Sequence, residues 1–157
     1  MSPFRGDRMS HSYTNILVHA LFGTKDRGPW LAREWRPDLF SYMAGILKRL
    51  GAGPLTVGGV ADHAHLLFVL PSELTIADAM EKVKANSSRW IHERSPSLRD
   101  FGWQTGYTAF SVSQSNVERV RHYIATQEAH HRKLTYREEV MALLRKHGIE
   151  PDPRFEP

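Results

Sequence analysis

The chain of 157 residues is predicted to be one α/β (α+β) domain of the ferredoxin-like type, a split β-α-β antiparallel sheet with additional C-terminal helices. Two observations predict this fold. Apolar, β-branched stretches alternate with stretches of helical periodicity in the order strand, helix, strand, strand, helix, strand, and two further helices with start signals follow. No repeat or linker divides the chain, and its length suits a single core. We therefore expect a flexible N-terminal lead-in over residues 1–12, one domain over 13–150 and a tail over 151–157.

The first strand is expected over Tyr13–Phe22, ending at Gly23. A helix should open near Pro37, which suits a first turn, and end at Gly51, a typical C-terminal cap. Leu55–Ala61 reads as a strand that turns at once into the next one, so the pair should be an antiparallel hairpin.

Helix start signals organise the second half of the chain. Thr75 and Asp78 begin a helix that Ser95-Pro96 closes, and Tyr107–Ser113 alternates as the fourth strand. Capping boxes then predict two helices. They are formed by Ser115 with Glu118 for residues Asn116–His131, and by Thr135 with Glu138 for Tyr136–His147, which Gly148 ends.

Composition narrows the class of function. The net charge of +4 favours an anionic partner, most often nucleic acid. The absence of cysteine excludes disulfides, thiolate metal sites and cysteine nucleophiles. No apolar run is long enough to cross a bilayer and no signal peptide is recognisable, so we expect a cytoplasmic protein without a membrane partner.

The hairpin's second strand carries the first candidate site. Asp62-His63-Ala64-His65 runs into Leu66–Leu70, and alternation places His63 and His65 on one face while the other face is apolar throughout. Such a strand lies in the middle of a sheet. Two neighbouring imidazoles can bind a divalent metal. By itself, the pair also fits two ordinary histidines bonded to backbone or water.

The second candidate lies in the Asn116–His131 helix. Tyr123 and Gln127 are four residues apart, so their side chains project together beside the packing face. Gln127 offers an amide oxygen to a metal, and Tyr123 offers a hydroxyl that could attack a metal-polarised phosphorus. A boundary tyrosine and a solvated glutamine are the alternative interpretation.

Taken together, these motifs resemble the single-tyrosine (IS200-like) transposases of small bacterial insertion sequences, members of the HUH endonuclease superfamily. The matching segments occur in the family's order and spacing over nearly the whole chain, and they are Leu21–Arg27, Asp62–Leu67, Trp103–Tyr107, Ala109–Ser113 and Tyr123–His131. The resemblance implies that His63, His65 and Gln127 are metal ligands and that Tyr123 is the nucleophile.

The same resemblance implies an activity. The protein would be a metal-dependent single-strand DNA endonuclease and strand transferase that cleaves and rejoins DNA with hairpin ends through a 5′-phosphotyrosine. It implies Mg²⁺ or Mn²⁺ as the cofactor, and two imidazoles with an amide oxygen favour manganese. It also implies a homodimer in which the tyrosine helix of one subunit completes the histidine site of the other.

Several residues are candidates for DNA contacts. The basic ones are Lys25, Arg27, Lys82, Lys84, Arg89, Arg119, Arg121, Arg132 and Lys133, and the aromatic ones are Trp103, Tyr107 and Phe110. Among the remaining histidines, His130 lies nearest to the Tyr123 row, and His19 and His92 are interpreted as structural.

Three alternatives remain. The first is a domesticated relative that processes chromosomal repeat hairpins, and the second is a ferredoxin-like nucleic-acid-binding module without chemistry. The third is a zinc hydrolase, which is disfavoured because no third histidine or acid stands at an obvious ligand spacing.

Overall fold

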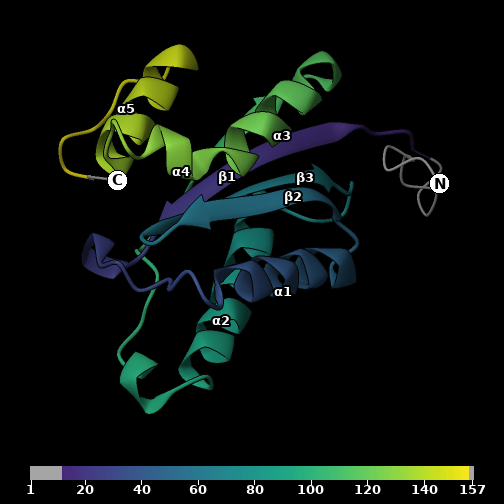
Figure 1. Ribbon diagram of the computed structural model, residues 1–157. Helices are drawn as coiled ribbons and strands as arrows, with labels where there is room; N and C mark the ends of the chain where they lie inside the picture. Colours follow the sequence, from purple (N-terminus) through teal and green to yellow (C-terminus); the bar gives the residue numbers. More distant parts are fainter. Residues whose placement is uncertain (1–11, 156–157) are drawn as a thin grey trace.

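A computed structural model describes residues 12–155 (Figure 1). Four antiparallel strands form one sheet in the order β2-β3-β1-β4. Their bounds are Ile16–Gly23 for β1, Gly53–Val60 for β2, His63–Leu70 for β3 and Thr108–Val112 for β4. This strand order, with β1 and β3 central, confirms the ferredoxin-like fold.

Helices cover both faces of the sheet (Figure 1). The first face carries α1 (Arg36–Arg49) and α2 (Ile76–His92). The second carries α3 (Val117–Ala125), α4 (Gln127–His130) and α5 (Tyr136–Lys146). Short 3₁₀ turns occupy Lys25–Arg27, Pro96–Leu98 and Gln114–Asn116. The three helices near the C-terminus therefore enclose the face on which the histidine pair lies.

Alternation along β3 divides the core into two layers. Ala64, Leu66 and Phe68 pack with α1 and α2, whereas Leu67 packs with Val117 and Ile124 of α3. Both faces of the strand are buried, as its apolar sequence predicts. The hairpin joining β2 to β3 is antiparallel, with Val60 opposite His63.

Several predicted boundaries are corrected. The second strand spans Gly53–Val60 instead of Leu55–Ala61, and the fourth spans Thr108–Val112 instead of Tyr107–Ser113. The first strand begins at Ile16 instead of Tyr13, whose side chain is 95% exposed and has no sheet partner. The second helix ends at His92, before Ser95. Ser95 adopts an extended conformation ahead of Pro96 and caps the following 3₁₀ turn by accepting a hydrogen bond from the Ser97 amide.

Two of the three predicted helix caps are present and the third is not. Thr75 accepts a hydrogen bond from the Asp78 amide, and Thr135 forms a complete capping box with Glu138. The box predicted for Ser115 is wrong, because residues 114–116 form a 3₁₀ turn and the Ser115 hydroxyl bonds to Ser113 instead. The α-helix begins only at Val117.

The long helix predicted over Asn116–His131 is also interrupted. Thr126 leaves helical geometry, with φ −105° and ψ 26°, and separates α3 from α4. Its hydroxyl donates a hydrogen bond at 2.8 Å to the His122 carbonyl oxygen, which also accepts from the Thr126 amide at 3.0 Å, and such a second bond often bends a helix. Gln127 consequently starts a new helical segment, α4, so its position relative to Tyr123 is not that of two residues in one continuous helix.

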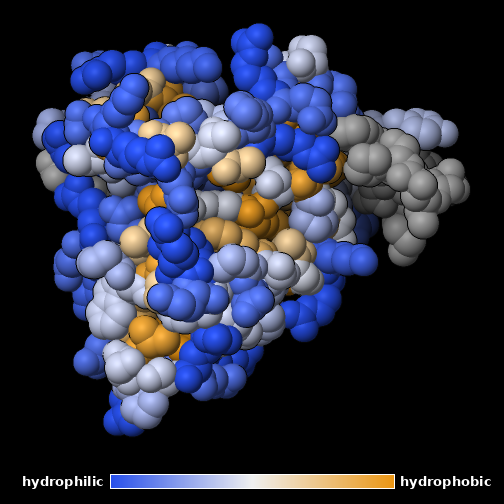
Figure 2. All heavy atoms as spheres, viewed as in Figure 1, coloured by the Kyte–Doolittle hydropathy of each residue, from blue (hydrophilic) through white to orange (hydrophobic). Residues whose placement is uncertain are grey.

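Polar and charged side chains cover most of the face in Figure 2, with apolar side chains gathered between them. Among residues 12–155, no helix combines the length and apolarity that a membrane span requires. Of the lead-in expected over residues 1–12, only Ser12 falls within the described residues.

Candidate active site

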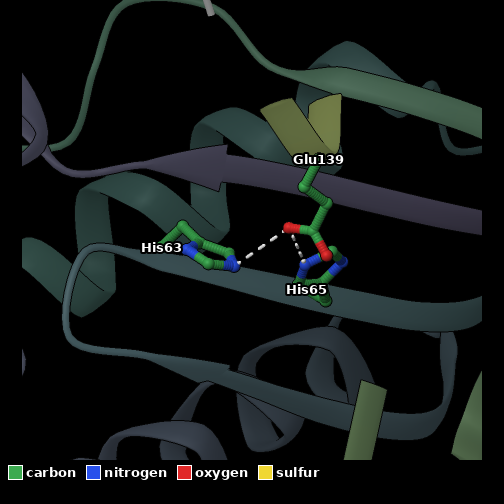
Figure 3. A group of neighbouring side chains, drawn as sticks. All are labelled: His63, His65 and Glu139. Carbon is green, nitrogen blue, oxygen red and sulfur yellow. Dashed lines mark hydrogen bonds and ion pairs between the residues drawn. The ribbon is translucent and has the colours of Figure 1, made fainter. Parts of the chain in front are cut away.

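His63 and His65 stand on the same side of β3 and turn their rings toward Glu139 of α5 (Figure 3). All three side chains are buried. The Nε2 atoms of both imidazoles lie 3.2 Å from Glu139 Oε1. One ligand atom from each residue falls within 4.8 Å of the others, a grouping that could hold a metal ion.

The other ring nitrogen of each histidine is fixed by a protein partner. His63 Nδ1 lies 2.8 Å from Asp62 Oδ1, and His65 Nδ1 lies 2.8 Å from His19 Nε2. These contacts orient both rings so that their Nε2 atoms face the same point. Histidines that bind metals are usually oriented in this manner by a carboxylate or another polar group behind the ring.

Gln127 joins the cluster from the first position of α4. Its side chain is buried, and its Oε1 lies 2.8 Å from His63 Nε2 while its Nε2 donates to Glu139 Oε2 at 3.0 Å. His131 Nε2 lies 3.1 Å from Gln127 Oε1 and 3.0 Å from Glu139 Oε1. The interrupted helix thus brings an amide and a third imidazole to the histidine pair.

Tyr123 approaches from α3, whose side chains pack over β2 and β3. Its hydroxyl donates a hydrogen bond to Glu139 Oε2, and its ring centroid lies 5.8 Å from that of His65. The phenol, both imidazoles and the amide therefore meet within one chain.

The buried groups shift one another's protonation. Burial lowers the pKa of His63, but hydrogen bonds to Asp62 and Glu139 outweigh it and raise the pKa to about 9. Burial raises the pKa of Glu139, yet hydrogen bonds from His131, His63 and His65 bring it well below its usual range. The carboxylate is thus stabilised in its charged form by the imidazoles that face it.

The pKa values of the neighbouring histidines are lowered, unlike that of His63, and the pKa of Tyr123 is raised, unlike that of Glu139. Burial and the charge of His65 lower the pKa of His19 to about 3, and burial also lowers the pKa of His65. For Tyr123, burial and the hydrogen bond to negatively charged Glu139 raise the pKa above its ordinary value. Tyr123 is therefore held as a neutral phenol in this arrangement.

Sequence reasoning missed Glu139, His131 and His19. Glu139 lies in the first turn of α5, where an acidic residue is ordinarily explained by the helix dipole. It meets His65 across 74 positions of the chain, a separation at which no local spacing gives a signal. No third histidine or acid stands at an obvious ligand spacing, as the sequence indicated, but the fold brings Glu139 and His131 to the histidine pair. The missing spacing therefore no longer counts against a zinc hydrolase.

His130, by contrast, stays outside the cluster. Its ring lies 4.7 Å from that of Tyr123, and its Nε2 is 3.1 Å from the Thr126 hydroxyl. His92 Nε2 lies 2.7 Å from the Phe101 carbonyl oxygen, in keeping with a structural role.

The candidate DNA contacts differ in their surroundings. Lys84 is half-buried and donates to the carbonyl oxygens of Gln104 and Gly106 at 2.6 Å. It therefore joins α2 to the segment that precedes β4. Arg121 donates to Leu55 O at 3.0 Å and Arg89 to Asn86 Oδ1. The side chains of the others are exposed, namely Lys25, Arg27, Lys82, Arg119, Arg132 and Lys133.

The aromatic candidates are mostly core. Trp103 packs edge-on against Phe22 and donates to the Ser87 hydroxyl at 2.9 Å. Phe110 is buried, and only Tyr107, 40% exposed, presents a large free ring surface. Tyr136, a second tyrosine close to the site, is buried and stacks on His63 at 4.5 Å.

Comparison with known proteins gives a consistent result. The family described as "Transposase IS200 like" matches residues 12–127. Transposases for insertion sequence element IS200 from Salmonella typhimurium (strain LT2) and Salmonella typhi are each 26% identical over 125 residues, covering 76% of this chain and 81% of theirs.

Two solved structures share the fold. A putative transposase from Deinococcus radiodurans superposes with a TM-score of 0.61 at 21% identity, covering 78% of this chain and 97% of that one. A REP-associated tyrosine transposase bound to a REP hairpin gives a TM-score of 0.59 at 11% identity, covering 89% and 86%. Because the family match spans most of the chain and the fold agrees, this protein belongs to the family of IS200-like transposases.

Proposed function

We propose that this transposase cleaves and rejoins single-stranded DNA through a 5′-phosphotyrosine on Tyr123, assisted by a divalent metal. The observation that carries the proposal is the convergence of the Tyr123 hydroxyl, two oriented imidazoles and a buried carboxylate in one chain. A phenol directed into a cluster of metal-binding groups is the arrangement that phosphoryl transfer to tyrosine requires.

The residues present fit a divalent metal. Nitrogen donors come from His63 and His65, and oxygen donors from Gln127 and Glu139, all on buried side chains. Asp62 and His19 hold the imidazoles in place from behind. Imidazole with carboxylate and amide oxygen suits manganese, and magnesium is the other candidate. Bound there, the cation would polarise the scissile phosphate and balance its developing negative charge.

The chain's own groups account for the remaining chemistry. The Tyr123 oxygen forms a bond to phosphorus while the bond from phosphorus to the 3′ oxygen breaks. The 3′ oxygen leaves with that electron pair and takes up a proton, and the phosphate stays on Tyr123 through its 5′ side. A second 3′-hydroxyl reverses the step, because the phosphotyrosine keeps the ester bond.

Glu139 fixes the position of the nucleophile, because its Oε2 accepts the hydrogen bond from the Tyr123 hydroxyl. Its imidazole partners hold its pKa well below its usual range, so the proton that the phenol loses during attack goes to water, which also supplies the proton to the leaving 3′ oxygen. Because the same carboxylate faces both imidazoles, it links the nucleophile to the metal-binding groups. We therefore add Glu139 to the proposed site formed by Tyr123, His63, His65 and Gln127.

The proposed DNA partner is a single strand with hairpin ends. One structural relative is bound to a REP hairpin, and its fold extends over 89% of this chain. Two sources of hairpin remain, the ends of an insertion sequence and chromosomal repeats. Both share the same chemistry, and they are separated by which DNA is cut.

A binding module without chemistry is disfavoured by the covering of the sheet. Ferredoxin-like modules that read single strands stack bases on aromatic side chains of an open sheet face. Here α3, α4 and α5 lie over that face (Figure 1), and its side chains at the β3 end are the buried His63 and His65.

A homodimer is proposed on the family resemblance alone. Within this chain Tyr123 already meets its own histidines, so exchange of the tyrosine helix is not required for convergence. Light scattering measures the oligomer, and a mixture of Tyr123→Phe and His63→Ala chains tests sharing. If the mixture regains activity, the site is shared between subunits. If the mixture stays inactive, each chain completes its own site.

The main test incubates the full chain with a single-stranded hairpin from the DNA flanking its gene, with Mn²⁺ or Mg²⁺. We expect a covalent protein–DNA adduct that chelation prevents and that Tyr123→Phe abolishes. His63→Ala should abolish cleavage while leaving hairpin binding largely intact.

The matched control is Tyr107→Phe, which removes an exposed phenol from the edge of the sheet and should leave the adduct unchanged. An adduct that persists in Tyr123→Phe refutes the proposed nucleophile. Equal adduct yield in the presence of a chelator refutes the metal requirement.

A further inference from the structure

A cavity of about 240 Å³ opens beside the nucleophile, between the end of β4, α3 and α5. Its lining includes Tyr123 and His19, the residue that orients His65. It is therefore continuous with the candidate active site while lying outside the metal-binding cluster. Pockets for small ligands usually measure about 300 to 1,000 Å³, so a single nucleotide unit is a better match than a larger molecule.

The cavity wall carries two cations. Arg119 of α3 and Lys146 at the end of α5 are exposed and line it from two sides. Neither forms an ion pair with any residue between 12 and 155, in contrast to Arg121, which pairs with Glu118. Unpaired cations on both sides of a cavity favour an anionic occupant, and a backbone phosphate has the right charge.

The remaining lining offers groups that bind a base. Asn116 precedes α3, yet its side chain makes no capping hydrogen bond, which leaves its amide available to the cavity. Ser111 adds an exposed hydroxyl. The His147 ring stacks on Phe110 at 4.0 Å and is bonded through Nδ1 to the Leu143 carbonyl oxygen, so it presents a fixed flat surface.

We propose that this cavity holds one nucleotide of the DNA strand next to the scissile phosphate, with Arg119 and Lys146 on its phosphate and Asn116 and His147 on its base. The inference rests on the proposed function for its substrate, a single DNA strand. It assigns the choice of base beside the cleavage position to these side chains.

The test measures the affinity of the full chain in the Tyr123→Phe background for a labelled single-stranded hairpin, so that no cleavage disturbs binding. Lys146→Ala should weaken binding and reduce the dependence of log affinity on log salt by about 0.7, the amount lost with one single-strand phosphate contact. Its control is Arg145→Ala, which removes the neighbouring cation of α5 that lines a different surface hollow.

A series of strands with one abasic nucleotide tests the base. One abasic position beside the cleavage site should weaken binding about 5- to 150-fold, as a lost base contact of about 1 to 3 kcal/mol predicts. Asn116→Ala should weaken binding to the intact strand and have little further effect on that abasic strand. Thermal melting verifies that each variant is folded.

Equal affinities and salt slopes for Lys146→Ala and Arg145→Ala overturn the phosphate assignment. The base assignment is overturned if Asn116→Ala weakens binding by the same factor for the intact strand and for every abasic strand. If wild-type protein forms no covalent adduct with any strand, the proposed function fails, while these binding measurements still decide for or against the cavity.

Discussion

Glu139 is the residue that joins the separate parts of the site. It accepts the hydrogen bond from Tyr123 and from the Gln127 amide, and its other oxygen faces His63, His65 and His131. A buried carboxylate in such a position costs free energy unless it is paired, and here every neighbour is a donor or an imidazole. The residue therefore has both a structural and a chemical reason to be acidic.

Replacing this carboxylate tests its role. Glu139→Gln should lower Mn²⁺ affinity and the rate of adduct formation at least about tenfold, because an oxygen anion facing both imidazoles is lost. Calorimetric titration with Mn²⁺ and a gel assay for the adduct measure the two effects.

Glu138→Gln is the matched control for that substitution. Glu138 is exposed and serves the capping box of α5, a position that accepts glutamine as well as glutamate. Equal metal affinity in both variants would remove Glu139 from the site.

Tyr136 provides a second prediction for a single residue. Its hydroxyl is buried and has no hydrogen-bond partner among the described residues. Tyr136→Phe should therefore raise the free energy of unfolding by about 1 kcal/mol, since a buried unsatisfied hydroxyl is removed. Denaturant unfolding measures the gain, and the adduct yield should stay at the wild-type value. A lost adduct would instead move the nucleophile to this residue.

At the scale of elements, the position of α3 depends on a close approach to β2. A Cβ added at Gly58 would lie 3.0 Å from both the carbonyl oxygen and the Cγ2 of Ile124. Ile124 directly follows Tyr123, so the absence of a side chain at Gly58 lets the tyrosine helix lie close to the sheet.

Gly58→Ala should therefore lower the free energy of unfolding by about 1 to 3 kcal/mol and slow adduct formation, because α3 must move away. Gly45→Ala is the control. Gly45 lies inside α1 with nothing within 4 Å of an added Cβ, and its replacement should stabilise the protein by about 0.5 to 1 kcal/mol. Unfolding curves that fall together for both variants would contradict this account of α3.

Most of the secondary-structure elements could be predicted from the sequence, whereas the break in the helix at Thr126 could not. Periodicity predicted every strand and the helices α1, α2 and α5, because burial of one face leaves a local pattern. The break at Thr126 left none, since a threonine is tolerated inside many helices and its departure from helical φ and ψ shows only in the folded chain. Local spacing made His63, His65, Tyr123 and Gln127 candidates, and the family resemblance implied their roles.

The meeting of α5 with β3 could not be predicted from local spacing. Glu139 contacts His65 through packing of distant elements, and its acidic neighbour Glu138 in the same first turn points to solvent and serves the cap. Only the folded chain distinguishes the two glutamates.

For the whole molecule, the sheet separates the larger apolar core from the face that carries the candidate site. The apolar layer under α1 and α2 includes most of the buried side chains, and the polar cluster occupies the opposite side. A metal that binds the folded cluster but not the unfolded chain must stabilise the entire domain by mass action.

Mn²⁺ at about one hundred times its dissociation constant should accordingly raise the free energy of unfolding by about 2.7 kcal/mol. The gain should disappear in His63→Ala, and denaturant unfolding with and without Mn²⁺ measures it. His92→Ala, which alters a histidine remote from the cluster, should keep the gain. An identical gain in His63→Ala would place the metal elsewhere.

The most direct measurement is identification of the amino acid that becomes linked to DNA. The wild-type chain is incubated with Mn²⁺ and the single-stranded hairpin, digested with protease and nuclease, and examined by mass spectrometry. The convergence of the phenol with the imidazoles and Glu139 predicts a nucleotide esterified to Tyr123. A nucleotide found on Tyr136, or on any other residue, would contradict it.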